Sequence, residues 1–187
     1  MKNTIEIRWH ARGGQGAKTA SLLFAEAMLE LGKYIQAFPD YGPERTGAPI
    51  RAYNRISNKP IRNYSAVTSP DMVIVLDPTL LKNPNTIVGI KEDGVIIINT
   101  EKKVQEIKSN LGVNNKIITV PASKISLDIL GKNIPNTVML GALVKALDLE
   151  FKELQKGLKT RLLIKFRKKS EYIKKNLKAI EQAYKLS

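Results

Sequence analysis

The chain has 187 residues, of which 43% are hydrophobic, so it can bury the core of one ordinary domain, and disorder along its whole length is excluded. It contains no cysteine, which excludes disulfides, thiolate zinc sites, Cys-ligated iron–sulfur clusters and a cysteine nucleophile within this chain. Its single histidine, His10, leaves little room for a histidine-based metal site or a Ser-His-Asp triad.

The formal net charge of +14 is concentrated towards the end of the chain. Residues 151–187 hold 12 Lys/Arg against 3 Asp/Glu, whereas residues 1–150 hold 19 against 14. Apolar residues recur there at helical spacing, which predicts a basic amphipathic helical arm over 151–187 after an α/β domain over 1–150. Its cationic face suits solvent or an acidic protein partner. Nucleic acid is the least favoured partner, because no nucleic-acid-binding motif accompanies the charge.

The first forty residues predict a strand, a glycine loop, a helix and a second strand. Residues 5–9 alternate as a strand does, and residues 11–16 form a tight loop. Residues 17–31 carry one apolar stripe at helical spacing and stop before Gly32, and residues 34–38 form the next strand. This order predicts a βαβ crossover with parallel pairing and a right-handed connection.

The rest of the chain continues the α/β pattern. Residues 50–56 alternate as a strand, and we expect residues 61–64 to pair back on it as a hairpin. Asp77 is expected to cap a helical turn that starts at Pro78, and Asn136 to cap a later helix. Buried strands are expected over 72–76, 95–99 and 117–120, and helices over 102–111, 123–130 and 137–147. The sequence predicts a three-layer α/β/α domain with a mostly parallel, mixed sheet.

The glycine loop is a candidate anion site. A glycine loop that opens a helix presents unpaired backbone N–H groups and the positive end of the helix dipole to a ligand. Arg12 and Lys18 flank this loop. Neither common phosphate motif matches, since Arg12 stands where the first P-loop glycine would be and Thr19 replaces the third glycine of the dinucleotide fingerprint. The alternative is that the glycines only permit a tight turn.

A second candidate lies in residues 41–49, a Gly- and Pro-rich segment expected to form an exposed loop after a strand. Glu44 and Arg45 there are either ligand contacts or a solvated ion pair. His10 is more typical of a buried imidazole with satisfied hydrogen bonds than of a catalytic base. The sequence shows no nucleophile with a neighbouring base, no paired carboxylates and no cluster of metal ligands, so we assign no catalytic residue and no metal site.

The N-terminus lacks the apolar segment of a signal peptide, and the longest aliphatic runs are far too short to span a bilayer. A cytoplasmic protein without a membrane partner is therefore expected.

Four motifs resemble the gamma subunit of 2-oxoacid:ferredoxin oxidoreductases, and the pyruvate and 2-oxoisovalerate enzymes are the most similar. They read RWHARGGQGAK over 8–18, QAFPDYGPERTGAP over 36–49, RAYNRI over 51–56 and IPNTVMLGAL over 134–143. The resemblance covers roughly residues 5–150 and implies a non-redox subunit with a three-layer α/β fold. It implies a complex that converts a 2-oxoacid, CoA and oxidised ferredoxin to an acyl-CoA, CO2 and reduced ferredoxin.

The resemblance also implies the partners and cofactors. Alpha, beta and delta subunits would be the partners, and they would hold thiamine diphosphate, Mg and the [4Fe–4S] clusters. Ferredoxin would interact through the complex, and the gamma subunit would contribute to assembly and CoA binding. The CoA-binding residues expected here are Arg12, Gly13, Gly14, Gln15, Gly16, Lys18, Glu44, Arg45, Thr46 and Gly47.

Three other functions stay open at this stage. The chain could serve the 2-oxoisovalerate enzyme instead of the pyruvate enzyme. A stand-alone nucleotide-binding α/β protein, such as an NAD(P)-dependent enzyme, is less favoured because Thr19 replaces the third glycine of the fingerprint. A nucleic-acid-binding module rests on net charge alone and would show a steep dependence of binding on salt.

Overall fold

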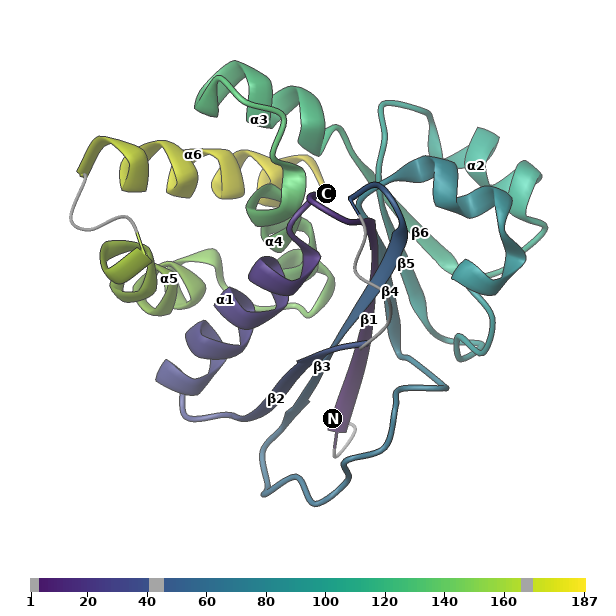
Figure 1. The fold of residues 1–187 in the computed structure, drawn as a ribbon, viewed down its shortest axis with the longest axis horizontal. Helices are drawn as coiled ribbons and strands as arrows, with labels where there is room; N and C mark the ends of the chain where they lie inside the picture. The colour runs from purple at the N-terminus through teal and green to yellow at the C-terminus, as the bar shows by residue number, and fades with distance from the viewer. Residues whose placement is uncertain (1–3, 41–45, 166–169) are drawn as a thin grey trace.

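The computed structural model describes residues 4–40, 46–165 and 170–187. Within these residues, six strands form one mixed sheet in the order β2-β3-β1-β4-β5-β6. Figure 1 shows α1 and α3 to α6 on one side of the sheet and α2 on the other, which is the predicted three-layer arrangement. The strands are β1 (Thr4–Arg12), β2 (Tyr34–Pro39), β3 (Pro49–Ser57), β4 (Met72–Val75), β5 (Val95–Asn99) and β6 (Lys116–Val120).

One half of the sheet is parallel, as predicted. β1, β4, β5 and β6 run in the same direction, and their branched side chains are buried on both faces. On one face, Ile74 and Ile97 pack in the main core beneath α1 and α4. On the other face, Val73 and Ile96 pack in a second cluster that includes Ile107 of α2. Both faces of these strands are covered by other elements, so apolar residues can follow one another without alternating with polar ones.

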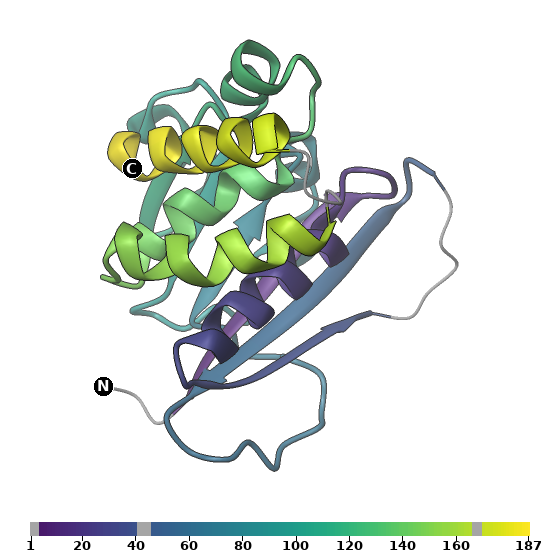
Figure 2. The same ribbon diagram turned by 90° about the vertical axis from the view of Figure 1, so that its left-hand side faces the viewer.

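The other half of the sheet corrects the predicted parallel pairing of the first two strands. β1 and β2 do not pair, because β3 lies between them and runs antiparallel to both. Side chains of β3 have partners on the neighbouring strands: Asn54 Oδ1 accepts from Trp9 Nε1 at 2.8 Å, and Arg55 Nε donates to Glu6 Oε1 at 2.7 Å. These polar contacts fix β3 beside β1, in the long antiparallel ribbon of Figure 2.

The predicted hairpin over residues 61–64 is wrong. These residues form no strand and belong to an extended loop between β3 and β4. Two backbone carbonyls of this loop accept hydrogen bonds from a side chain instead of from a neighbouring strand: Arg55 donates to Asn63 O at 3.3 Å and to Ser65 O at 2.6 Å. The loop thereby covers Arg55, whose side chain is 1% exposed, whereas Arg51 on the same face of β3 is 49% exposed.

The predicted helices are present. Asp77 caps the first turn after β4 as expected, with Oδ1 accepting from Thr79 N at 3.0 Å. The predicted cap at Asn136 is wrong, because the helix starts at Pro135, two residues before the predicted start, and Asn136 lies in its first turn. The helices are α1 (Ala17–Glu30), α2 (Val104–Leu111), α3 (Ala122–Leu130), α4 (Pro135–Ala146), α5 (Phe151–Lys165) and α6 (Ser170–Leu186), with 3-10 turns η1 (Pro78–Lys82) and η2 (Pro84–Thr86).

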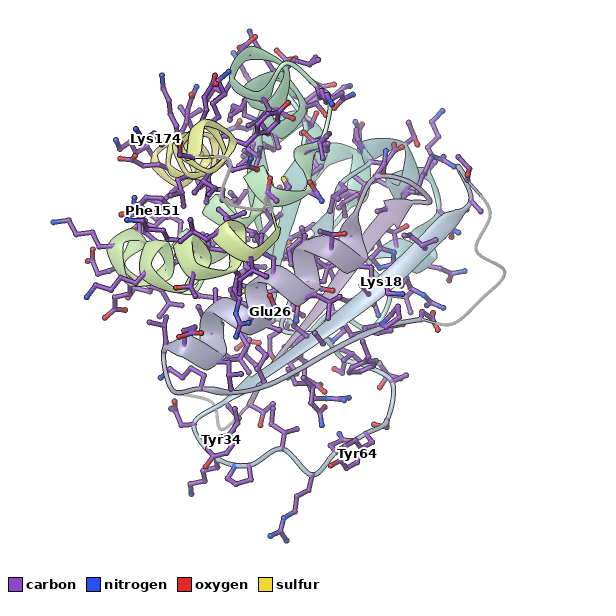
Figure 3. The ribbon with its side chains drawn as sticks, turned by 60° about the vertical axis from the view of Figure 1, so that its left-hand side comes forward. Lys18, Glu26, Tyr34, Tyr64, Phe151 and Lys174 are labelled. Atoms are coloured by element: carbon purple, nitrogen blue, oxygen red, sulfur yellow. The ribbon has the colours of Figure 1, made fainter. Side chains whose placement is uncertain are left out.

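The basic C-terminal segment forms α5 and α6, which pack on the other helices as an outer layer (Figure 2). Leu154, Leu158 and Leu162 of α5 and Ile173 and Ile180 of α6 are buried in the same core cluster as the sheet. The apolar stripe at helical spacing therefore faces the domain, and lysines such as Lys174 point outward (Figure 3). In the described part of the chain, no helix combines the length and apolar character needed to cross a bilayer.

Candidate functional site

The glycine loop forms a tight turn between β1 and α1. Gly14 and Gly16 adopt left-handed backbone conformations, with φ of +95° and +80°, which side chains with a Cβ rarely adopt. Gly13 N donates to Ala48 O at 2.8 Å, and Gly47 N donates to Gly13 O at 3.1 Å. The turn is thus tied to the start of β3, and Gly47 of the second candidate segment lies beside it.

The start of α1 is open to a ligand. Gly16 is the N-cap, no side chain caps the first amides, and no acidic residue stands in the first turn, as far as the described residues show. Gly14 and Lys18 are exposed, and Figure 3 shows Lys18 at this end of α1. Asn136 closes one side of the turn by donating from Nδ2 to Gly16 O at 3.1 Å. Uncapped amides and an exposed lysine at a helix N-terminus favour the binding of an anion.

The side chain of Arg12 holds the turn against η1. Its Nε donates to Asp77 Oδ2 at 3.1 Å, its Nη1 to Gly47 O at 3.1 Å and its Nη2 to Thr79 Oγ1 at 2.9 Å. Gln15 binds the same carboxylate, because its Nε2 donates a hydrogen bond to Asp77 Oδ2 at 3.0 Å. Arg12 and Gln15 therefore position the loop, and Lys18 has no ion-pair partner among the described residues and is exposed.

The network sets the ionisation of Asp77. Burial alone would raise the pKa of this carboxyl, but hydrogen bonds from Thr79 and Gln15 and the charge of Arg12 outweigh it and lower the pKa below its ordinary value. A lowered folded-state pKa means that the ionised carboxylate stabilises the fold at pH values above the ordinary value of 3.8. This contribution is lost as the pH falls through the lower folded-state pKa.

We expect Asp77→Asn to flatten the acid dependence of stability. The wild-type free energy of unfolding should fall more steeply below about pH 4 than that of the variant, because the variant has no carboxylate to protonate at this position. Urea unfolding at several pH values measures both slopes. Identical slopes in the two proteins would contradict the role assigned to Asp77.

A cleft of about 610 Å³ opens on the face of the sheet opposite α1, next to the turn. We call it the cationic cleft, because every charged side chain among its described lining residues is basic: Arg12 of β1, Arg51 of β3 and Lys82 of η1. His10 and the side chains of Asn83 and Asn85 also line it. The ends of β1 and β3 and the 3-10 turns η1 and η2 bring these residues together.

His10 is held by a buried arginine at the back of this cleft. Arg8 Nε donates to His10 Nε2 at 3.0 Å, while Arg8 Nη2 donates to Val88 O at 2.6 Å. Burial, followed by the charges of Arg8 and Arg51, lowers the pKa of His10 to about 3. His10 is only 7% exposed, which agrees with the predicted buried imidazole, and it is neutral at physiological pH.

Comparison with known proteins settles the family. A family model described as pyruvate ferredoxin/flavodoxin oxidoreductase matches residues 6–186, which is nearly the whole chain. The chain belongs to this family. The match continues through α5 and α6, although the resemblance found in the sequence covers only roughly residues 5–150.

Several relatives are similar over most of their length. The chain is 54% identical over 144 residues to the pyruvate synthase subunit PorC of Thermotoga maritima, covering 77% of this chain and 74% of the relative. It is 43% identical over 182 residues to the pyruvate/ketoisovalerate oxidoreductases common subunit gamma of Pyrococcus furiosus, covering 96% and 95%. A crystal structure of the Thermotoga maritima subunit superposes with a TM-score of 0.86 at 44% identity, covering 99% and 97% of the two chains.

The structure brings most of the predicted site residues together. The turn holds Arg12, Gly13, Gly14, Gln15 and Gly16, with Lys18 one turn into α1, and Thr46 and Gly47 are exposed at the neighbouring end of the second segment. Glu44 and Arg45 lie outside the described residues. No pattern in the sequence predicted Lys82, Asn83 or Asn85 as residues of the cationic cleft. Basic residues at every second position of β1 (Arg8, His10 and Arg12) were the available signal, since they share one face of the strand.

Proposed function

We propose that this chain is the gamma-type subunit of a pyruvate:ferredoxin oxidoreductase and that its glycine turn binds the diphosphate of CoA. The observation that carries the assignment is the similarity over nearly the full chain to relatives named as subunits of pyruvate synthase and of pyruvate/ketoisovalerate oxidoreductases. The complex would convert pyruvate, CoA and oxidised ferredoxin to acetyl-CoA, CO2 and reduced ferredoxin. We further propose that it works in the cytoplasm.

The cofactor chemistry belongs to the partner subunits in this proposal. Thiamine diphosphate, Mg and the [4Fe–4S] clusters would be held by alpha, beta and delta subunits, and ferredoxin would receive its electrons from them. This division agrees with the absence of cysteine from the sequence, because thiolates are the usual ligands of such clusters. The chain's own contribution is to bind the acyl acceptor and to support assembly.

The glycine turn suits a diphosphate for physical reasons. The amides at the start of α1 have no capping side chain among the described residues, and a Cβ at the left-handed Gly14 would meet no atom within 4 Å, so the turn is open on that side. On the side of Gly16 the space is filled by Asn136. Lys18 adds an exposed positive charge. Asp77 lies nearby, but Arg12 and Gln15 occupy its Oδ2.

Replacing Lys18 with alanine tests the site. We expect CoA binding to the assembled complex to weaken by roughly 1–3 kcal/mol, because one charge-assisted hydrogen bond to phosphate is lost, while the fold stays intact. Calorimetric titration with CoA measures the change. The matched control is Lys174→Ala on α6, which removes the same charge from an exposed position far from the turn (Figure 3). Equal CoA affinity in wild type and Lys18→Ala would disprove the phosphate role.

Mass spectrometry of the proteins that co-purify with the tagged chain tests the assembly. Thiamine-dependent and cluster-bearing subunits should be recovered together with it in fixed ratios. A chain that stays alone in its native cell would contradict the proposal.

The substrate of the complex has a second candidate. The Pyrococcus furiosus relative is named as a subunit common to the pyruvate and ketoisovalerate enzymes, so one gamma chain there serves two complexes. By this analogy the present chain would also join a branched-chain 2-oxoacid enzyme. Two distinct sets of catalytic subunits in the co-purified material would support this second candidate, whereas a single set would restrict the chain to one enzyme.

A further inference from the structure

The cationic cleft has positive charge and hydrogen-bond donors left over after its internal contacts are formed. Lys82 has no ion-pair partner among the described residues and is exposed. Arg51 Nη2 contacts Asp40 Oδ2 at 2.7 Å, but the Arg51 side chain is 49% exposed and keeps further N–H groups. Oδ1 of Asn83 accepts from Asn85 N at 3.0 Å, which leaves the side-chain NH2 group of Asn83 as a donor.

His10 contributes one more donor, and geometry decides which ring nitrogen carries it. Nε2 accepts from Arg8 Nε at 3.0 Å, so the proton of the neutral ring is on Nδ1. Arg8 cannot rotate away easily, because its Nη2 donates to Val88 O at 2.6 Å and to Thr86 O at 3.3 Å. No partner for Nδ1 occurs among the described residues, and His10 lines the cleft. A side chain that is 7% exposed thus keeps a free N–H group at a cavity wall.

We propose that the cationic cleft binds a phosphomonoester group, with the Nδ1–H of His10 as a neutral donor and with Lys82 and Arg51 supplying the charge. A phosphomonoester offers three acceptor oxygens and about two negative charges. Several donors on different sides of the cleft match three oxygens better than the two oxygens of a carboxylate. Arg8 is a positioning residue in this site, because it acts through His10.

Two kinds of ligand could place a phosphate group in the cationic cleft. Arg12 begins the glycine turn with its backbone and lines the cleft with its side chain, so one ligand that carries several phosphates can reach both places. The 3′-phosphate of CoA is then the occupant, and this source rests on the proposed function. The other source is a separate phosphate ester or inorganic phosphate, which does not depend on it.

The site should bind phosphate without help from histidine protonation. Among the described residues, the charged groups of the cleft around His10 are Arg8 and Arg12 of its own strand, Arg51 of β3 and Lys82 of η1. The nearby carboxylates of Asp77 and Asp40 are paired with Arg12 and Arg51. Adding a proton to Nε2 would also break the hydrogen bond from Arg8. His10 should therefore remain a neutral donor between pH 5 and pH 8.

Nitrogen NMR of the full-length chain tests the donor directly, because its single histidine gives one imidazole spectrum. We expect a protonated Nδ1, no titration between pH 5 and 8, and a saturable shift of the Nδ1 signal on addition of inorganic phosphate. Ordinary titration near pH 6.5, or a spectrum that phosphate leaves unchanged, would overturn the proposal. In Arg8→Gln, the ring should titrate within this range and phosphate binding should strengthen towards acid, which a purely structural arginine would not produce.

Two variants and two ligands identify the source in the assembled complex. Lys82→Ala should weaken inorganic phosphate binding about tenfold, whereas the matched control Lys116→Ala on β6, also exposed, should not. If the ligand is CoA, Lys82→Ala weakens CoA binding but not 3′-dephospho-CoA binding, while Lys18→Ala weakens both. If the ligand is separate, Lys82→Ala affects phosphate alone.

The experiments distinguish a failure of the phosphate site in the cleft from a failure of the CoA diphosphate site in the proposed function. Unchanged phosphate binding in Lys82→Ala, together with an unperturbed His10, rejects the cleft as a phosphate site, whatever Lys18→Ala does. Unchanged CoA binding in Lys18→Ala rejects the diphosphate site of the proposed function and leaves the test of the cleft with inorganic phosphate intact.

Discussion

Arg55→Ala is expected to lower the free energy of unfolding by about 3–5 kcal/mol, because it removes one partner of a buried ion pair. The Arg55 side chain is 1% exposed, and its guanidinium joins Glu6 of β1, Gln36 of β2 and the carbonyls of Asn63 and Ser65. Alanine would leave the half-buried Glu6 without its cation and the covering loop without its attachment. Urea unfolding of the purified chain measures the loss.

The same strand offers the control. Arg51 also pairs with a carboxylate, but its side chain is 49% exposed and that of Asp40 is 39% exposed. Solvent screens such a pair, so Arg51→Ala should lower stability by less than about 1 kcal/mol. A second variant, Glu6→Gln, keeps a hydrogen-bond acceptor and removes only the charge, and it should be destabilising as well. If Arg55→Ala and Arg51→Ala lower the free energy of unfolding by the same amount, burial does not explain the contribution of the Arg55–Glu6 pair to stability.

Gly141→Val is expected to destabilise the fold by about 3 kcal/mol or more, because α4 and α6 touch at this glycine. A Cβ at Gly141 would overlap the carbonyl oxygen of Ile180 and lie 2.7 Å from Tyr184 N and 3.0 Å from Ala183 Cβ. Backbone atoms cannot move aside as a flexible side chain can, so the two helices would have to separate. Thermal and urea unfolding measure the effect.

The smaller change Gly141→Ala distinguishes the destabilising effect of crowding against α6 from the stabilising effect of higher helix propensity. In an exposed helix this substitution would stabilise by about 1 kcal/mol, because alanine loses less conformational entropy than glycine. At Gly141 the overlap with α6 should outweigh that gain, and the variant should be less stable than wild type. Lys178→Val on the exposed surface of α6 is the control for adding a branched residue, and it should change stability by only a few tenths of a kcal/mol. A stabilising Gly141→Ala would show that the helices tolerate a wider separation.

Local sequence patterns predicted the elements because burial is periodic along the chain. The branched runs that form β4, β5 and β6 are buried on both faces, and a helix stop was correctly predicted before Gly32, which has positive φ. The turn between β1 and α1 was predicted from its glycines for the same local reason. The wrong cap at Asn136 shows the limit of local rules, since that side chain hydrogen-bonds to Gly16, 120 residues earlier in the chain.

Strand order could not be predicted in the same way. The sequence order strand, helix, strand suggested that β1 and β2 pair, but β3 lies between them, with a backbone ladder to each strand and side-chain hydrogen bonds to both. The hairpin over 61–64 failed because a buried arginine used the carbonyls of that loop. Each outcome depends on residues far apart in the chain.

The sequence by itself determined most of the helix and strand positions, the basic charge of the C-terminal segment and the glycine turn, because each depends on neighbouring residues and on the periodicity of burial. Only the tertiary structure decided that β3 lies between β1 and β2, that α5 and α6 close the main core, and that His10, Arg51 and Lys82 share one cleft. The physical reason is that the free energy of these contacts is gained only after distant segments have come together, so no local pattern contains it.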